Sequence, residues 1–409
     1  MRYELLNQSY ELPFIERLLT IRKIASDSES FFQPSFTNTR HDPFLLNDMK
    51  KAVEHIIQAM RNHDKIMIFG DYDVDGVTAS YCLYKFLRYF LKYPEVSIMY
   101  PNRKEDGYGL KVKHLEDMKT KGVDLVITVD NGITSIEEAL YAKTLNIDLI
   151  ITDHHHPLND LPAAIAVVNP CCSPKYPFHG LAGVGVAFKL INALLTKCTF
   201  DSKKKNQIFN FFLPIVAIGT VADVVPLLDE NRFIVQKGLD LINHSPDTLP
   251  PSLKGFLSYL NIKSPVDTYH IGFVIGPRIN AGGRMQSPYD SLNILLHEGE
   301  PQLAFLQKID EINNDRRKTQ DQGFKVAEKM VNLEKHLLVA RSEEFHEGVI
   351  GIMAGRLTEK YHKPSMIFKV DPEKGTASAS LRGPDYFNVI DMILAHEEIL
   401  ERYGGHKGA

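Results

Sequence analysis

An acidic cluster follows the apolar run at residues 66–69. Its carboxylates, Asp71, Asp73 and Asp75, are each separated by one residue and are bounded by glycines at positions 70 and 76. In an extended segment, alternation places all of them on one face. Like charges at this spacing repel each other unless a strong positive charge lies among them. Because Mg²⁺ and Mn²⁺ prefer carboxylate oxygens, the cluster predicts a divalent-cation site; a solvated acidic turn is the alternative.

Further candidate ligands follow other apolar runs. Asp130 comes directly after the β-branched run at 125–129, and an Asp-His-His sequence at 153–155 comes after the run at 147–151. In an open parallel sheet, the carboxyl ends of the strands border the crevice in which ligands bind. Acidic residues at three strand ends therefore predict one shared metal site. His154 is well placed to bind a metal through a ring nitrogen.

Two more residues near these motifs have open interpretations. Asp223 follows an apolar stretch that ends at Ala222, and it is either another ligand or an exposed carboxylate at the end of a helix. His156 ends the histidine run and is expected to point away from its neighbour, so we interpret it as supporting or structural.

The elements that must position these residues alternate between strand and helix patterns, which is typical of a parallel α/β sheet. We predict strands at 65–70, 96–100, 124–129, 147–152 and 164–169, and helices at 77–91, 111–121, 135–145, 181–196 and 206–221. The lysines at 203–205 are interpreted as a solvated turn, and the segment 276–284 as a glycine-rich loop.

The length of 409 residues predicts more than one domain. We predict an N-terminal extension at 1–45, an α/β catalytic domain with a parallel sheet at 46–300, a connecting helix at 301–335 and a smaller α/β domain at 336–409. The long connecting pattern is charged and helical, with few residues that break a helix.

Composition bounds the class of protein. A hydrophobic content of 44% and a charged content of 24% are ordinary for a globular protein, and no stretch approaches the roughly 20 apolar residues that span a bilayer. The cysteines show no metal-ligand pairing, which favours the cytoplasm. The net charge of −4 does not exclude a nucleic-acid substrate, since two divalent ions would neutralise four ligand aspartates.

Together, these motifs resemble those of the DHH phosphoesterase superfamily. The similar segments, in chain order, are Asp-Tyr-Asp-Val-Asp-Gly at 71–76, Asp130, Asp153 to His155, and Asp223, which match motifs I to IV. Segments at 101–109, 276–284 and 346–352 are similar to the bacterial single-strand-specific exonucleases of the superfamily, and Gly-Gly-His at 404–406 is similar to the signature of the associated DHHA1 domain. The resemblance runs from about Phe31 to the last residue.

The resemblance implies a metal-dependent 5′→3′ exodeoxyribonuclease that releases mononucleotides from single-stranded DNA during DNA repair and recombination. It implies two Mn²⁺ or Mg²⁺ ions as cofactors. It also implies single-strand-binding protein and a RecQ-type helicase as partners, and no association with a membrane. The alternative is a related phosphoesterase acting on short oligonucleotides, cyclic dinucleotides or pyrophosphate. Those relatives commonly carry a histidine where this chain has Phe69, which disfavours them.

The resemblance also assigns residues. The implied metal ligands are Asp73, Asp75, Asp130, His154 and Asp223, with Asp130 bridging both ions; His155 would contact the scissile phosphate, and Asp71 and Asp153 would support the cluster. The implied phosphate contacts are Arg103, Arg278, Asn280, Arg284, Arg382 and His406. Around Arg382 the chain reads Ser-Leu-Arg-Gly, which departs from the Ser-Gly-Arg-Ser usual in the family.

The sequence stops at Ala409, within the DHHA1 motif. The OB-fold of the family has no counterpart in these residues. We therefore expect an incomplete DHHA1 domain and a catalytic core whose affinity for DNA is weak and sensitive to salt.

Overall fold

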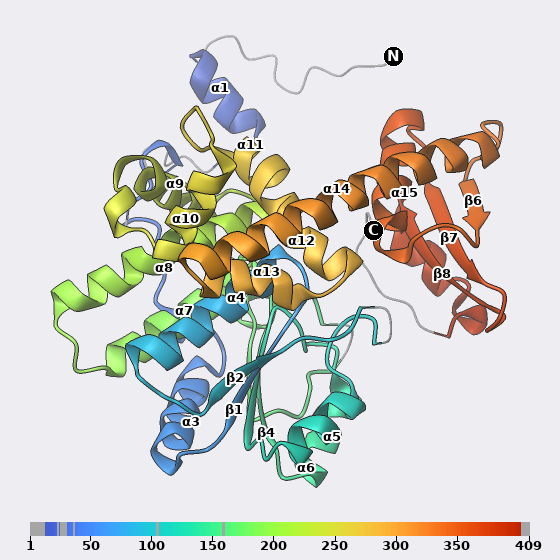
Figure 1. Cartoon of the computed structure of the whole chain (residues 1–409). Helices are drawn as coiled ribbons and strands as arrows, with labels where there is room; N and C mark the ends of the chain where they lie inside the picture. Colours follow the sequence, from blue (N-terminus) through green and yellow to red (C-terminus); the bar gives the residue numbers. More distant parts are fainter. Residues whose placement is uncertain are drawn as a thin grey trace. The chain divides into compact units, whose positions relative to one another are not determined.

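The computed structural model describes residues 13–22, 24, 31–35, 37–103, 106–157 and 160–401. These residues form two compact units, both of which contain a β-sheet covered by helices, as the α/β prediction requires. The first unit extends to Asn280 and includes Pro288–Leu306. The second comprises Ala281–Ser287 and the residues from Gln307 onward (Figure 1).

A parallel sheet of five strands lies at the centre of the first unit. Its strands are β1 (Ile66–Gly70), β2 (Val96–Met99), β3 (Leu125–Val129), β4 (Asp148–Thr152) and β5 (Ala166–Val168), in the spatial order β2-β1-β3-β4-β5. The register pairs Gly70 with Val129, and Val129 with Thr152. Three neighbouring strands therefore end level with one another, so the residues that follow them begin at the same height.

Helices cover both faces of this sheet. The helices of the first unit are α1 (Phe14–Ile21), α3 (Met49–Asn62), α4 (Val74–Lys85), α5 (Val112–Thr120), α6 (Ile136–Thr144), α7 (Gly183–Lys197), α8 (Ser202–Ala222), α9 (Asp229–His244), α10 (Pro251–Leu260), α11 (Thr268–His270) and α13 (Pro288–Leu296), with π-helices η2 (Phe86–Phe90) and η5 (Ile271–Ile275). Helix α4 packs on β1 and β3, and α7 packs on β3 and β4. Short 3₁₀ turns occur at Pro43–Leu45, Pro170–Cys172 and Pro246–Thr248.

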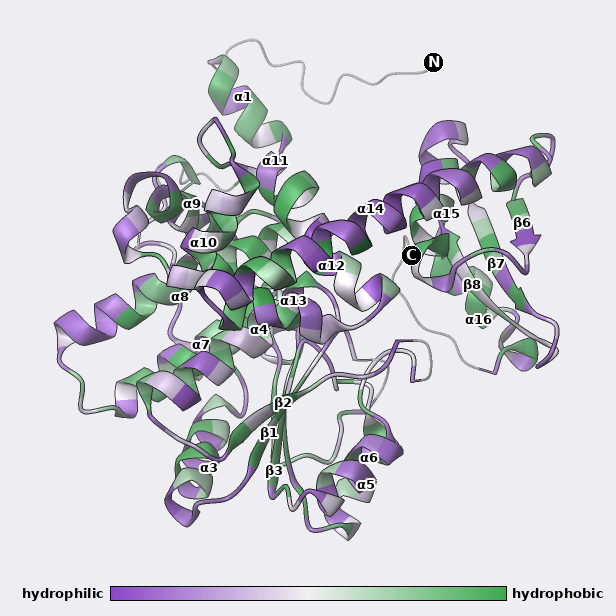
Figure 2. Cartoon of the chain, in the orientation of Figure 1, coloured by the Kyte–Doolittle hydropathy of each residue, from purple (hydrophilic) through white to green (hydrophobic). Residues whose placement is uncertain are grey.

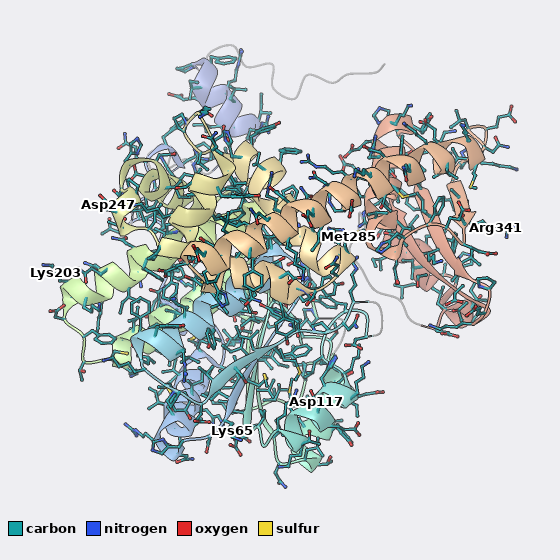
Figure 3. The ribbon with its side chains drawn as sticks, in the orientation of Figure 1. Lys65, Asp117, Lys203, Asp247, Met285 and Arg341 are labelled. Carbon is teal, nitrogen blue, oxygen red and sulfur yellow. The ribbon has the colours of Figure 1, made fainter. Side chains whose placement is uncertain are left out.

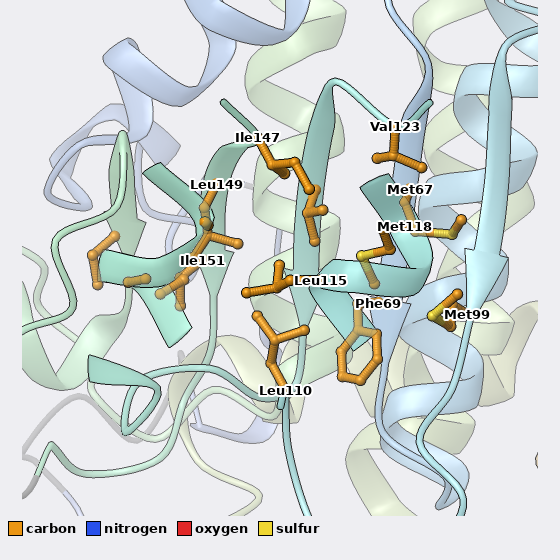
Figure 4. Packing of buried hydrophobic residues seen from close by; sticks show 14 of the residues in the cluster. Met67, Phe69, Met99, Leu110, Leu115, Met118, Val123, Ile147, Leu149 and Ile151 are labelled. Carbon is orange, nitrogen blue, oxygen red and sulfur yellow. The ribbon is translucent and has the colours of Figure 1, made fainter. Parts of the chain in front are cut away.

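The opposite face of the sheet packs against α5 and α6 and forms a continuous apolar core. Met67 and Phe69 of β1 lie beside Leu115 of α5, and Leu149 and Ile151 of β4 belong to the same cluster (Figure 4). These strand residues alternate along the chain, because successive side chains point to opposite faces. The hydrophobic colouring of β1 and β3 in Figure 2 follows from burial on both faces.

The second unit contains a smaller mixed sheet. Its strands are β6 (Leu338–Ser342), β7 (Ser365–Asp371) and β8 (Thr376–Arg382); β6 runs parallel to β7, and β7 antiparallel to β8. Its helices are α15 (Glu347–Tyr361), which packs on β7 and β8, α16 (Val389–Leu394) and a 3₁₀ turn at Glu397–Ile399. The long helix α14 (Gly299–Met330) starts in the first unit and continues into the second.

Two local interpretations of the sequence are wrong about secondary structure, although Lys203 and Lys204 are exposed to solvent as expected. The segment interpreted as a glycine-rich loop is helix α12 (Gly276–Met285). A Cβ on Gly276 would lie 2.9 Å from the carbonyl oxygen of Ile271 in the preceding turn. The missing side chain therefore lets α12 follow η5 without a steric clash. The lysines at 203–205 lie in the first turn of α8, where the Asp201 side chain accepts a hydrogen bond from Lys204 N (Figure 3).

A buried polar network joins α7 to α9. Lys189 Nζ lies 2.6 Å from Glu230 Oε1, which also accepts a hydrogen bond from His41 N at 3.0 Å, and the Tyr176 hydroxyl bonds the other oxygen. Each buried charge therefore has partners, as burial requires. This network anchors the start of α9, directly after the loop that carries Asp223. No helix in the described part of the chain is long and apolar enough to cross a membrane.

The central core predicts a large cost for truncation. Leu149 is 2% exposed, so Leu149→Ala should lower the free energy of unfolding by about 2–5 kcal/mol, through lost burial and a residual cavity. Urea unfolding followed by circular dichroism measures the change. Leu140→Ala is the matched control, because Leu140 is 54% exposed. Equal midpoints for the two variants would contradict this packing.

Candidate metal centre

The candidate site begins where the level strands end. Asp71 follows β1, Asp130 follows β3, and Asp153 follows β4. The main chain stays paired beyond the strands, since Asp130 N donates to the carbonyl oxygen of Thr152 at 3.0 Å. The sheet register alone therefore brings together acidic residues that are far apart in sequence, as the parallel-sheet argument predicted.

The turn between β1 and α4 directs two carboxylates into the site. Asp73 is the N-cap of α4, and its Oδ1 accepts a hydrogen bond from Gly76 N at 3.1 Å. Asp75 lies in the first turn and accepts hydrogen bonds from Gly183 N at 2.6 Å and Val184 N at 2.8 Å. These donors are the first N–H groups of α7, whose helix dipole favours a negative charge there.

Asp130 and Gly183 are in close contact. Asp130 has a left-handed backbone with φ of 63°, which Asp tolerates better than bulky residues do. A Cβ on Gly183 would lie 2.5 Å from Asp130 Oδ1. Gly183 therefore contacts Asp75 through its N–H group and Asp130 through its bare Cα, so only glycine fits this position without displacing a carboxylate.

His154 lies at the centre of the carboxylates. Its Nε2 is 3.1 Å from Asp130 Oδ1, 3.7 Å from Asp223 Oδ2 and 3.8 Å from Asp75 Oδ2. Asp223 is the C-cap residue of α8, and it is followed by Val224 in a left-handed conformation with φ of 63°. A single imidazole thus faces carboxylates from three separate elements.

Burial and mutual repulsion hold these carboxylates in unfavourable surroundings. Burial, followed by the charge of Asp73, raises the pKa of Asp75 to about 7, while the α7 N–H groups oppose the shift. Burial and the charges of Asp75 and Asp73 raise the pKa of Asp223 to about 9. The pKa values of Asp71 and Asp130 are also raised well above the ordinary range, chiefly by burial.

The donor set fits divalent ions. Within the described residues, Asp71 Oδ1, Asp130 Oδ1 and Asp223 Oδ2 are buried and accept no hydrogen bond. Possible ligand atoms lie within 4.8 Å of one another in three groups: Asp75, His154 and Asp223; Asp71, Asp73 and Asp130; and Asp130, His154 and His155, which shares a residue with each of the other two. Oxygen-rich groups with one imidazole suit Mn²⁺ or Mg²⁺. Asp71, expected only to support the cluster, offers an oxygen in the same group as Asp73 and Asp130.

Asp153 orients His155 rather than joining the carboxylate groups. Its Oδ1 lies 2.7 Å from His155 Nδ1 and accepts a hydrogen bond from His154 N, and its Oδ2 accepts one from Ile133 N. Burial raises the pKa of Asp153, but the bond to His155, the charges of His155 and His154 and the bond from Ile133 N together outweigh burial, so the net pKa is lowered. Burial lowers the pKa of His155, but the same bond and the charges of Asp153, Asp71 and Asp75 together produce a net rise.

Tyr108 is a site residue that the sequence analysis did not single out. Its hydroxyl donates to the carbonyl oxygen of Asp130 at 3.0 Å and lies 3.2 Å from His155 Nδ1. Gly107 and Gly109 on either side have φ of 73° and 79°, so the loop around Tyr108 depends on left-handed conformations. The flanking glycines were the available signal in the sequence. Gly183 was also missed, because its contacts are long-range.

Three of the expected phosphate contacts belong to the first unit. The Arg103 guanidinium lies over the Tyr72 ring, 4.8 Å from its centroid, and its charge lowers the pKa of Asp71. Arg278 Nη1 donates to the carbonyl oxygen of Val274 at 2.8 Å. Asn280 Oδ1 accepts a hydrogen bond from Val74 N at 3.2 Å. Asn280 therefore holds the turn that carries Asp73 and Asp75.

The other expected contacts belong to the second unit or lie outside the described residues. Arg284 is part of α12, and its carbonyl oxygen would be 2.1 Å from a Cβ on Gly348. Arg382 ends β8, and its Nη1 donates to Ser380 Oγ at 3.1 Å and to the carbonyl oxygen of Leu381 at 2.9 Å. His406 lies outside the residues that the structure describes.

The contact between Gly183 and Asp130 can be tested directly. In Gly183→Ala the new methyl group displaces the Asp130 carboxylate, so affinity for Mn²⁺ should fall at least about tenfold. Isothermal titration with Mn²⁺ measures it. Gly185→Ala is the control in the same helix, because its Cβ would meet only the Leu181 side chain, from 3.3 Å. Unchanged affinity in Gly183→Ala would disprove the close contact.

Family models match both units of the chain. Residues 65–220 match the DHH family N-terminal domain, and residues 334–409 match the DHHA1 domain. The solved structure of RecJ in complex with Mn²⁺ from Thermus thermophilus covers 89% of this chain with a TM-score of 0.77 and 27% identity, over 51% of its own length. A second structure, of exonuclease RecJ bound to manganese, has a TM-score of 0.75 over 89% of both chains.

Curated relatives extend the match along the chain. The single-stranded-DNA-specific exonuclease RecJ of Bacillus subtilis is 34% identical over 98% of this chain, which spans 50% of that relative. The protein of the same description from Haemophilus influenzae is 32% identical over 96% of this chain, which spans 70% of it. The chain thus spans about half the length of the first relative and over two thirds of the second. It belongs to the RecJ family of DHH proteins.

Proposed function

We propose that this chain hydrolyses single-stranded DNA from the 5′ end and releases mononucleotides, as a metal-dependent exonuclease of DNA repair and recombination. One observation carries the proposal: two candidate ligand groups (Asp75, His154 and Asp223; Asp71, Asp73 and Asp130) are joined by a third group of Asp130, His154 and His155. Two ions at such sites supply Lewis-acid chemistry, by neutralising charge on phosphate oxygens and lowering the pKa of a water. The names of the relatives and the metals in the RecJ structures support the proposal.

The protein residues have distinct proposed roles. Asp73, Asp75, Asp130, His154 and Asp223 hold the ions, as expected from the family motifs, and Asp71 is close enough to join them. The N–H groups of α7 fix Asp75 before substrate arrives, so this carboxylate needs no rearrangement during the reaction.

His155 is proposed to act on the scissile phosphate. Because Asp153 bonds its Nδ1, Nε2 is the nitrogen that can reach a substrate. A hydrogen bond from this nitrogen to phosphate oxygens would stabilise the negative charge that develops on them.

Arginines are proposed to position the phosphates. Arg103 and Arg278 suit this role in the first unit, since guanidinium groups bind phosphate through paired donors. Arg284 of α12 and Arg382 and His406 of the second domain remain proposed phosphate contacts.

We also propose domain limits at 46–300 and 336–409, with 301–335 as the connection, which is helical in α14 up to Met330. Single-strand-binding protein and a RecQ-type helicase remain predicted partners, and the cytoplasm the predicted location.

The alternative, a phosphoesterase for short oligonucleotides or cyclic dinucleotides, is less well supported. Phe69 is fully buried in the apolar core, at the position where those relatives commonly have a histidine. The curated RecJ relatives also favour the exonuclease.

A long 5′-phosphorylated strand tests the proposal. The protein should release mononucleotides progressively in Mn²⁺ and stop when the metal is chelated. Asp130→Ala removes a carboxylate from the centre of the site and should lower the rate more than about a hundredfold without unfolding the protein, as circular dichroism can verify. Asp117→Ala is the control, because Asp117 is exposed on α5. Hydrolysis restricted to very short substrates would favour the alternative instead.

Tyr108→Phe tests the support of His155. The variant loses the hydrogen bond to the Asp130 carbonyl oxygen and the contact with His155 Nδ1. One or two such interactions predict a fall of about three- to tenfold in the rate of mononucleotide release. Tyr89→Phe is the control, since Tyr89 is 54% exposed on η2. If Tyr108→Phe releases mononucleotides at the same rate as the control, Tyr108 does not support His155 in the reaction.

A further inference from the structure

An exposed pair of aromatic rings lies on the helical segment that leads into α12. Tyr269 and Phe273 are 61% and 64% exposed. Their rings stack with centroids 4.9 Å apart and an interplanar angle of 29°. We call these two residues the aromatic ledge. Large apolar rings gathered on a surface mark a place where something binds more often than scattered ones do.

Side-chain hydrogen bonds fix the helical turn that carries Tyr269. Asp267 caps the segment, because its Oδ1 accepts a hydrogen bond from His270 N at 3.0 Å, and the His270 ring lies edge-on to Tyr269. His270 Nε2 also lies 3.3 Å from Ser264 Oγ. Binding to such a fixed platform loses little conformational entropy.

The segment packs beside one of the candidate ligands. η5, which carries Phe273, packs against α8. A Cβ on Gly276 would lie 3.6 Å from Cβ of Ala222, the residue that precedes Asp223. Val224, on the other side of Asp223, is 86% exposed, so the border of the site adds a further apolar side chain.

The same segment reaches the other ligands. Asn280 bonds Val74 N, between Asp73 and Asp75. At 1.5 Å per residue, Phe273 lies roughly 10 Å along the helix axis from Asn280. Arg278, a proposed phosphate contact, lies between them in sequence. The ledge is therefore continuous with the candidate metal centre through one helical segment of the first unit.

We propose that the aromatic ledge stacks the bases of single-stranded DNA on the 3′ side of the scissile bond. This inference rests on the proposed function, in which the 5′ end occupies the metal centre and the rest of the strand must leave it. Every nucleobase has a flat π-face, so stacking on Tyr269 and Phe273 binds any sequence. The phosphates between the stacked bases suit the neighbouring Arg278.

Strand length is the variable that tests the ledge. Binding of 5′-phosphorylated strands to the full chain is measured by fluorescence anisotropy in Mn²⁺, with phosphorothioate linkages that resist hydrolysis. Phe273→Ala should weaken binding of a strand of about 12 nucleotides by roughly five- to 150-fold, the range for one lost base stack. A 5′-phosphorylated dinucleotide carries only one base on the 3′ side of the scissile bond, and we expect it to end short of the ledge, so its affinity should not change. Phe273→Trp keeps a π-face and should restore binding.

Two controls make the result decisive. A strand that carries abasic sites downstream of its first two nucleotides should bind the wild-type protein and Phe273→Ala equally, because no base remains to stack. Tyr89→Ala truncates an exposed aromatic side chain elsewhere on the first unit and should leave binding unchanged. Equal weakening for long strands and the dinucleotide, or no weakening for either, overturns the ledge and leaves a protein partner as its occupant.

The ledge and the proposed function fail in different ways. If the wild-type protein does not hydrolyse a long strand in Mn²⁺, the proposed function itself is wrong. If it does, and the Tyr269→Ala and Phe273→Ala variants bind and degrade that strand as the wild type does, only the ledge is wrong.

Discussion

Repulsion between buried carboxylates is the constraint on which the arrangement of the first unit depends. Asp75 and Asp223 lie within reach of one imidazole, in surroundings that resist their ionisation. Several features reduce the cost: the N-terminus of α7 faces Asp75, His154 lies between carboxylates, and the oxygen-rich groups suit divalent cations. In a fold without these features, such carboxylates would have to be protonated or exposed to solvent.

The parallel sheet makes this concentration of charge possible. Because β1, β3 and β4 end level, their next residues meet without long loops. The polar network around Glu230 helps to position Asp223, since it anchors the start of α9 directly after the loop that carries this residue. Rigid elements thus deliver every acidic group, while the aromatic ledge and Tyr108 come from the segments that border them.

The sequence alone was enough to predict the α/β class and which acidic residues lie together. These carboxylates follow recognisable apolar segments, and the carboxyl ends of parallel strands meet at one edge of the sheet. It could not reveal contacts between distant segments. Gly183 is indistinguishable from other glycines until α7 is placed against Asp130, and Tyr108 until its loop meets β3. We interpreted the stretch at 276–284 as a loop because glycine has a low intrinsic helix propensity. The tertiary packing that makes this stretch a helix cannot be recognised from the local sequence.

The position of α7 links the metal centre to the stability of the whole first unit. One helix end contacts both Asp75 and Asp130, so α7 cannot shift without displacing both residues. A ligand that binds only the native state stabilises it by mass action. The concentration of free manganese or magnesium would therefore set how often α7 separates from the sheet, and with it the lifetime of the protein against cellular proteases.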